Sequence, residues 1–155
     1  MAQPKISEEE KLLQLLTRLR NLSPGTPPFE KVGITPPQFI LLDWIANSPG
    51  SGVSEIAEGL NLTSPTVSVA VRRLEKQGYL ERKHDTQDRR SIHLYLTQEG
   101  QALYQRGEEF RQHKVKRLLS GLPTKERTEF LELLETALNA AEISEKEIQR
   151  DKIFK

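Results

Sequence analysis

The sequence of 155 residues contains no cysteine. Disulfide bonds, zinc sites with cysteine ligands, iron–sulfur clusters and thiol-based redox switches are therefore excluded. Aromatic residues make up only 6% of the chain and hydrophobic residues 35%, which leaves little material for a β-sandwich and suits a helical protein. At roughly 150 residues per domain, the length corresponds to about one domain, so a two-domain enzyme is not expected.

Long apolar runs are also missing. The longest purely apolar run is Phe39–Leu42, whereas a membrane-spanning helix needs about eighteen or more such residues. The first ten residues carry three glutamates and no apolar segment, so we expect no signal peptide. Together with the lack of cysteine, these absences predict a cytoplasmic protein that does not enter a membrane.

Motifs for catalysis and cofactor binding are absent as well. The chain has no G-x-S-x-G elbow, no P-loop and no glycine-rich dinucleotide turn. Its histidines, His84, His93 and His113, lack the close spacing of metal ligands. Asp85 beside His84 fits a turn better than a catalytic triad. We therefore expect no cofactor, no metal and no enzymatic activity.

The small net charge of +1 hides an uneven distribution. Residues 64–93 carry seven Lys and Arg against four Asp and Glu, whereas residues 21–63 carry one against four. Local fields rather than the total charge steer polyanions to a protein. The basic segment is therefore the first place to look for a nucleic-acid contact.

Amphipathic helices are expected at both ends of the chain. Ser7 to Glu10 form a capping box that opens a helix over about 8–22, whose leucines follow helical spacing. Thr97 is expected to cap a helix over about 98–119, which Gly121 and Pro123 end. A last helix is expected over about 125–142, with an apolar stripe wider than one neighbouring helix would cover.

The middle of the chain predicts a winged helix-turn-helix. Thr35 opens a helix with prolines and Gln38 in its first turn, and two further helices follow, capped by Ser54 and Ser64 and joined by a tight turn. Two strands, residues 79–83 and 91–96, then form a β-hairpin. The predicted fold is mainly α with a small β-wing: residues 35–97 form the winged helix-turn-helix, and residues 1–34 and 98–155 form the amphipathic terminal helices.

The helix from Pro65 to Gln77 has two distinct faces. Val67, Ala70, Val71 and Leu74 fall on one side at 100° per residue and must face the core. The other side suits a DNA major groove because small hydrogen-bonding residues precede its cations. Thr66, Ser68 and Arg72 are expected to reach base edges, Val69 a thymine methyl, and Arg73 and Lys76 phosphates, with Ser64 at the start of the helix. Alternatively, the cations form an ordinary solvated face, paired with Glu75.

Two arginines stand at the tip of the predicted hairpin, in Asp88-Arg89-Arg90. Arginines crowded at such a tip contribute little to stability, whereas the negative potential of a narrow minor groove attracts guanidinium groups. We therefore predict that Arg90 enters the minor groove and that Asp88 aims it through a salt bridge. In the alternative interpretation, Asp88 only forms the turn.

Several motifs of this region resemble those of MarR-family transcriptional regulators. They are Val53–Leu60, the helix that Ser64 opens, Arg73–Arg82, Asp88–Ser91 and Leu96–Gly100. The resemblance implies the same wing roles for Asp88 and Arg90 and a recognition helix at about Pro65–Gln77. Many members carry Val-Thr-Arg or Val-Ser-Arg where this chain has Val67-Ser68-Val69, and an acidic residue where it has Arg72. The groove contacts are thus expected to differ from those of relatives.

The resemblance also implies a homodimer and a small-molecule effector. In such proteins the terminal helices interlock two subunits, and a two-fold dimer places two recognition helices about 34 Å apart on a pseudo-palindromic operator. The alternative is that both helices fold back on their own winged domain. A small aromatic or phenolic anion is expected between the dimerisation helices and the wing domain, in a cleft lined by Leu16, Phe39 and Trp44; ordinary core packing is the alternative for each of these residues.

The sequence thus predicts a cytoplasmic, homodimeric transcription regulator that binds double-stranded DNA, with the resemblance favouring a repressor released by its effector. The alternative is a protein-binding adaptor whose basic helix docks an acidic partner without DNA.

Overall fold

The structure, a computed structural model, describes residues 6–22, 25–84 and 92–153. The chain divides into two compact units, one up to Lys114 and one from Val115 onward. The elements in chain order are α1 (Glu8–Asn21), α2 (Pro28–Lys31), α3 (Pro36–Asn47), α4 (Val53–Gly59), α5 (Ser64–Lys76), β1 (Leu80–His84), β2 (Ile92–Leu96), α6 (Gln98–Leu119) and α7 (Thr124–Ile153).

The predicted capping boxes are present at the starts of α1 and α3. In α1 the Glu10 amide donates to the Ser7 hydroxyl and the Ser7 amide donates to the Glu10 carboxylate, both at 3.2 Å. In α3 the Thr35 amide donates to the Gln38 side-chain oxygen at 2.9 Å. These bonds satisfy amide groups that have no partner within the helix, and they fix where each helix begins.

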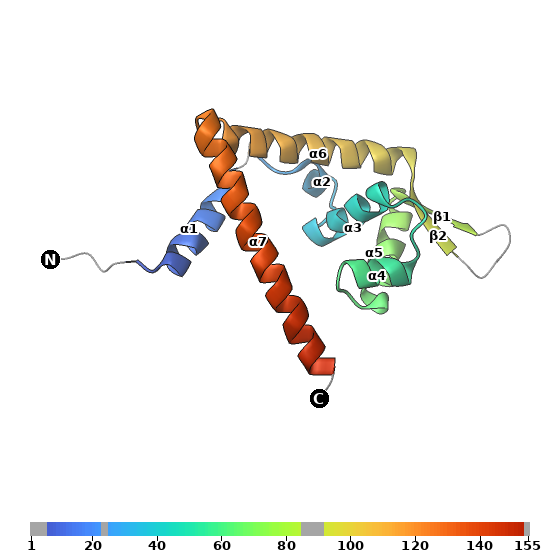
Figure 1. The fold of residues 1–155 in the computed structure, drawn as a ribbon. Coiled ribbons are helices and arrows are strands. Elements are labelled where there is room, and N and C mark those ends of the chain that lie inside the picture. The colour runs from blue at the N-terminus through green and yellow to red at the C-terminus, as the bar shows by residue number, and fades with distance from the viewer. Residues whose placement is uncertain (1–5, 23–24, 85–91, 154–155) are drawn as a thin grey trace. The chain divides into compact units, whose positions relative to one another are not determined.

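The first unit is built in layers around α3. The part of α6 up to Lys114 lies on one side of α3, while α4, α5 and the hairpin lie on the other (Figure 1). The core between these elements consists of apolar side chains from all of them, and those with the least exposure are Ile34, Leu41, Leu42, Ile45, Ile56, Val67, Val71, Leu74, Leu94 and Leu103. The inner face of α5 is thus part of this core, and its outer face is exposed.

The two strands pair as an antiparallel hairpin in which Leu80 faces Leu96 and His84 faces Ile92. This confirms the predicted wing. At its base the Gly78 amide donates to the Glu75 carbonyl and the Tyr79 amide to the Leu74 carbonyl, both at 2.9 Å. The hairpin is therefore joined directly to the end of α5.

Thr97 caps α6, as predicted, and also joins this helix to the hairpin. Its hydroxyl donates to the Gly78 carbonyl at 2.6 Å and accepts from the Gly100 amide at 3.0 Å, while its own amide donates to the Tyr79 carbonyl at 3.1 Å. A Cβ atom at Gly100 would lie 2.0 Å from the Tyr79 carbonyl oxygen, so only glycine fits there. The Leu-Thr-x-x-Gly motif, Leu96–Gly100, thus fixes the start of α6 against the hairpin.

Several predicted boundaries were wrong. The cap of α4 is Gly52 rather than Ser54. The cap of α5 is Thr63 rather than Ser64, because Ser64 is already the first residue of the helix. Both helices begin earlier because the preceding residue is extended and can take the cap position. The loop before α3 also contains the short helix α2, which was not predicted. Prolines in its first turn are compatible with a helix, since the missing amides have no helical partner there.

The second unit contains the end of α6 and the long helix α7, which continues to Ile153 rather than ending near residue 142. The side chains of α7 described up to Ile143 are exposed over a wide apolar stripe that includes Phe130, Leu134 and Leu138. In the first unit, α1 likewise has no buried residue and exposes its leucines. No helix among the described residues is long and apolar enough to cross a membrane.

Candidate nucleic-acid interface

The recognition helix α5 is anchored by its cap and by its inner face. The Thr63 hydroxyl accepts from the Thr66 amide at 3.4 Å and lies 2.8 Å from the Thr66 hydroxyl. Val67, Val71 and Leu74 are buried as predicted, and Ala70 is half-buried against the core. The turn before α5 contains Asn61 at φ 53°, a left-handed conformation that asparagine tolerates better than most residues.

The structure brings the predicted contact residues of α5 together on one outer face. Ser68 is half-buried; the exposed residues are Ser64, Thr66, Val69, Arg72, Arg73 and Lys76. Val69 is 47% exposed and is the apolar residue of this face. The face thus combines short polar groups, one apolar contact point and three cations within a single helix.

The cations of this face have no acidic partner among the described residues. Glu75, the acidic residue expected to pair with these cations, instead binds Arg82 of β1, with Arg82 Nε and Glu75 Oε1 2.7 Å apart. Paired cations form the usual solvated helix face. Arg72, Arg73 and Lys76 are therefore available for an external anion, and the interpretation in which Glu75 neutralises them is not the arrangement found.

The predicted wing contacts Asp88, Arg89 and Arg90 lie outside the described residues. The strands that lead to them carry further basic groups. The Lys83 ammonium lies 4.9 Å from the centre of the Tyr95 ring and 2.8 Å from the Glu81 carboxylate, whose hydrogen bond raises the pKa of Lys83. His93 is half-buried with Nδ1 2.6 Å from the Gly50 carbonyl oxygen. No group of three metal-binding side chains occurs in the described part of the chain.

The three residues predicted to line one effector cleft lie in different places. Phe39 is buried and lines a cavity of about 790 Å³, here called the Phe39 cavity, between α1, α2, α3 and α6. Trp44 lines a separate cavity of about 210 Å³, and its indole nitrogen is buried without a partner among the described residues. Leu16 is 52% exposed on α1 and lines neither cavity.

The Phe39 cavity combines an aromatic floor with a basic rim. The Phe29 and Phe39 rings stack with centroids 4.3 Å apart, and Phe110 also contributes to the lining. Three cations, Arg20, Arg111 and Lys114, line the cavity against a single carboxylate, that of Glu30. This lining suits a planar anion, because the rings bury its faces and the cations offset its charge.

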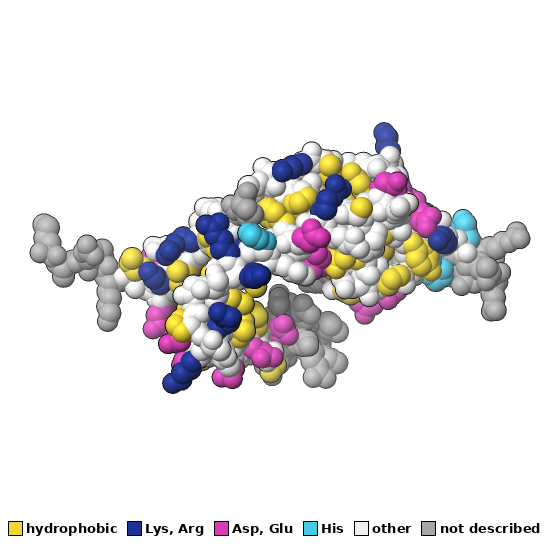
Figure 2. Space-filling model, turned by 90° about the horizontal axis from the view of Figure 1, so that it is seen from above, with side chains coloured by type: hydrophobic (Ala, Val, Ile, Leu, Met, Phe, Trp, Pro, Cys, Tyr) yellow, Lys and Arg dark blue, Asp and Glu magenta, His cyan; other side chains and the backbone are white. Residues whose placement is uncertain are grey.

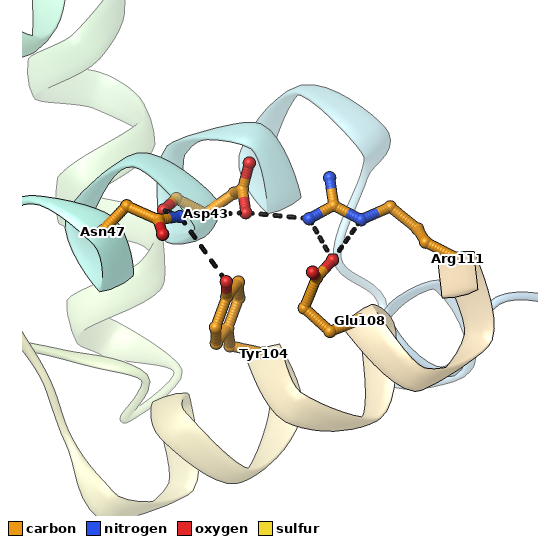
Figure 3. A network of polar contacts seen from close by, with 5 residues as sticks. All are labelled: Asp43, Asn47, Tyr104, Glu108 and Arg111. Carbon is orange, nitrogen blue, oxygen red and sulfur yellow. Dashed lines mark hydrogen bonds and ion pairs between the residues drawn. The ribbon is translucent and has the colours of Figure 1, made fainter. Parts of the chain in front are cut away.

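One of these cations belongs to a polar network that joins α3 to α6 (Figure 3). The Arg111 guanidinium lies 2.8 Å from the Asp43 carboxylate and also binds Glu108, and the Asn47 amide contacts the Tyr104 hydroxyl at 3.5 Å. Burial lowers the pKa of Arg111, but hydrogen bonds to Asp43 and Glu108 outweigh this effect and raise it overall. No local pattern predicts this pairing, because Asp43 and Arg111 are 68 positions apart.

The face seen from the α6 side has a mixed character. Basic, acidic and apolar side chains are interspersed over it (Figure 2). DNA-binding surfaces carry a marked excess of basic groups on one face. This view therefore does not show the surface expected for DNA, and α5 lies on the other side of α3 from α6 (Figure 1).

Comparison with known proteins supports the assignment of this fold. The model of the MarR family matches residues 34–92. The chain is 34% identical over 118 residues to the HTH-type transcriptional repressor MdtR of Bacillus subtilis, covering 76% of each chain. The chain belongs to the MarR family.

Solved structures of similar fold include FabT and PcaV. FabT of Streptococcus pneumoniae, in complex with DNA, is 24% identical with a TM-score of 0.72 over 87% of this chain and 98% of its own. The PcaV transcriptional regulator of Streptomyces coelicolor, in complex with its natural ligand, is 25% identical with a TM-score of 0.59 over 91% of this chain and 99% of its own. The helices and the small hairpin of this chain form a winged helix-turn-helix, and the likeness to these structures extends over most of the chain.

Proposed function

We propose that this MarR-family protein is a transcriptional repressor that reads DNA with the outer face of α5. The protein is a DNA-binding transcription regulator; in this proposal it acts in the cytoplasm and has no catalytic role. Thr66, Ser68 and Arg72 contact base edges, Val69 contacts a thymine methyl, and Arg73 and Lys76 contact phosphates. Ser64 lies at the groove entrance, in the first turn of the helix.

The observation that carries the proposal is the state of the three cations on α5. Arg72, Arg73 and Lys76 are exposed on the face opposite the core, while the nearby Glu75 is bound to Arg82. Unpaired arginines contribute little to folding, but they bind guanine edges and phosphates strongly. The repressor MdtR, of which this chain covers 76%, supports the same direction of control.

The protein acts as a homodimer in this proposal. The exposed leucines of α1 and the apolar stripe of α7 are large unpartnered surfaces, and such surfaces usually mark interfaces. Residues 1–34 and 98–155 supply this interface, and residues 35–97 form the DNA-binding winged helix-turn-helix. A two-fold dimer would present two copies of α5 about 34 Å apart, so the operator is a pseudo-palindrome.

Selection from a library of random duplexes tests the proposal. Recovery of an inverted repeat with half-sites one helical turn apart is the expected result, with a dimer measured in solution at micromolar concentration. The control is a variant in which Arg72, Arg73 and Lys76 are all glutamine. Failure to enrich any duplex would reject the regulator and favour a protein-binding adaptor.

The effector site of the repressor is the Phe39 cavity. An aromatic or phenolic anion would stack on Phe29 and Phe39 and pair with Arg20 and Lys114 at the rim. The PcaV regulator, which was solved with its natural ligand, supports ligand control in a protein of this fold. To release DNA, the effector must bind one spacing of the two α5 helices better than another.

Removal of one rim cation tests this site. Lys114→Met should weaken binding of 2-hydroxybenzoate by about 10-fold or more, because a charge-assisted hydrogen bond contributes about 1.5–3 kcal/mol. Titration calorimetry measures the affinity, and Lys116→Met, which removes an exposed lysine two residues further along α6, is the matched control. Equal affinities for both variants would place the effector elsewhere.

The wing makes a separate prediction. Arg90→Ala should weaken operator binding by about 1–3 kcal/mol, since a minor-groove arginine interacts with a concentrated negative potential. Fluorescence anisotropy with the selected operator measures the loss, and Arg106→Ala on α6 removes the same charge away from the wing. If the two variants bind equally well, Arg90 does not enter the groove and Asp88 has no guanidinium to aim.

A further inference from the structure

A small cavity lies where the start of α3 meets the end of α5. This cavity, here called the Gln38 cavity, has a volume of about 310 Å³. It is lined by Gly33, Thr35, Gln38, Arg73, Lys76 and Gln77. The lining includes two cations and no carboxylate. It is separate from the Phe39 cavity and from the base-reading part of α5.

The charges of the Gln38 cavity are not balanced by the described part of the protein. Arg73 and Lys76 are exposed and form no ion pair there, because the intervening Glu75 points to Arg82 at 2.7 Å. Two unpaired cations beside the Gln38 cavity attract an anion. Since both are long side chains on adjacent turns of one helix, they can converge on a single oxyanion.

Gln38 supplies a side-chain donor that has no partner among the described residues. The residue is only 8% exposed, and its side-chain oxygen accepts from the Thr35 amide at 2.9 Å and from the Thr35 hydroxyl at 3.1 Å. Its side-chain nitrogen has no hydrogen-bond partner among the described residues, although the residue lines the cavity. Because this nitrogen is not one of the fully enclosed unpartnered side-chain atoms, it stays accessible and can donate to an acceptor from outside the chain.

The backbone at the start of α3 cannot replace this donor. The first two residues of the helix, Pro36 and Pro37, have no N–H group. An anion at this helix start must therefore be bound by side chains. Gln38 is the only described side chain of the helix that both lines the cavity and carries hydrogen-bond donors.

We propose that the Gln38 cavity binds one phosphate group of the DNA backbone, with Arg73 and Lys76 neutralising its charge and the Gln38 amide donating to a phosphate oxygen. The inference rests on the proposed function and deepens it, because it turns two solvent-exposed cations into part of a three-residue phosphate clamp. The clamp fixes the position of the protein on the duplex and carries no base specificity.

The dimensions of α5 place the clamp at a groove wall. A helix of 13 residues is about 20 Å long, and the major groove is about 12 Å wide. When residues 64–72 lie in the groove, the last turn of α5 must therefore reach a sugar–phosphate strand. Arg73 and Lys76 occupy that turn, and the start of α3 lies beside it in the Gln38 cavity.

A purely structural role for the two cations makes a different prediction. Positive side chains in the last turn of a helix stabilise its free carbonyl groups. In that case, changes to Gln38 on another helix would leave DNA binding unaffected. The decisive variant therefore changes Gln38 and leaves both cations in place.

Gln38→Glu is that variant. A glutamate keeps the side-chain oxygen that closes the capping box with Thr35, but it replaces the free donor by negative charge. We expect affinity for every duplex to fall about 10-fold or more at 0.1 M salt, and the slope of log K against log salt to become shallower by about one to two units. Gln105→Glu, an equal charge change at an exposed position of α6, is the control, and thermal unfolding verifies that both variants fold.

Single neutral methylphosphonates in the selected operator locate the bound phosphate. In the wild-type protein, one substitution per half-site should weaken binding about 5-fold, and the same substitution should have little further effect in Gln38→Glu, since coupled changes are not additive. Inorganic phosphate should compete with DNA only weakly.

Three results would overturn the clamp. Gln38→Glu with the affinity and salt slope of Gln105→Glu shows that no phosphate is bound there. Binding of inorganic phosphate that is lost in Gln38→Glu while DNA affinity is unchanged assigns the cavity to a free phosphate compound. A wild-type protein that binds no duplex rejects the proposed function and the clamp with it, whereas the first two results leave the proposed function intact.

Discussion

Replacing Arg72 by alanine is expected to weaken binding to the selected operator by about 1–3 kcal/mol and to change binding to random DNA much less. Arg72 is exposed, has no acidic partner among the described residues, and follows Ser68 and Val69 by one turn on the outer face of α5. A guanidinium in that position reaches a guanine edge with two parallel hydrogen bonds. Competition binding with operator and random duplexes at one salt concentration measures the difference.

Arg73→Ala is the matched variant for this experiment. It removes the same charge from the adjacent residue, but its expected contact is a phosphate, so it should weaken binding to both duplexes alike. The ratio of the two affinities is therefore expected to fall in Arg72→Ala and to stay constant in Arg73→Ala. A constant ratio in both variants would show that Arg72 is a phosphate contact and that base reading lies elsewhere on α5.

Gly100→Ala is expected to destabilise the protein by about 3 kcal/mol or more, the largest stability effect that the described residues predict for one methyl group. The added Cβ would lie 2.0 Å from the Tyr79 carbonyl oxygen and 3.0 Å from its carbon, and both are backbone atoms that no rotamer can move. Relief requires shifting α6 away from the wing, which breaks the bonds that Thr97 makes to Gly78 and Tyr79. Urea unfolding followed by circular dichroism measures the loss.

The control for this prediction is Gly121→Ala. The same methyl group at that position would meet its nearest atom, the Leu118 carbonyl oxygen, at an ordinary distance of 3.5 Å. It should therefore change the free energy of unfolding by less than about 1 kcal/mol. If Gly100→Ala proves equally mild, the docking of α6 on the wing is more adaptable than the distances indicate.

Local patterns predicted most of the fold because they act over a few residues. The capping boxes of Ser7 and Thr35 fix two helix starts, the spacing of Val67, Val71 and Leu74 fixes the inner face of α5, and alternation fixes the hairpin. The misplaced caps of α4 and α5 show the limit of this reasoning. At each start two neighbouring residues can take the cap position, and packing of the whole helix decides between them.

The candidate site was predicted less completely, because parts of it depend on contacts between distant segments. The outer face of α5 followed from its periodicity, but the bond that removes Glu75 from that face requires a strand seven residues further on. The pairing of Asp43 with Arg111 and the meeting of Gln38 with Arg73 arise only when α3 is placed against α6 and α5. The predicted cleft residues Phe39 and Trp44 were both aromatic, yet the fold separates them into different cavities.

The bond between Glu75 and Arg82, together with the backbone bonds from Gly78 and Tyr79, fastens the reading helix to the first strand of the hairpin. If α5 enters one groove and the hairpin lies beside the next, as proposed, these bonds make the two elements move together. An effector that changes the separation of the two winged domains would therefore remove α5 and the hairpin of one subunit from the DNA in the same step. Release from the promoter should accordingly be abrupt, without a half-bound state in which the ribbon remains in place after the helix has left.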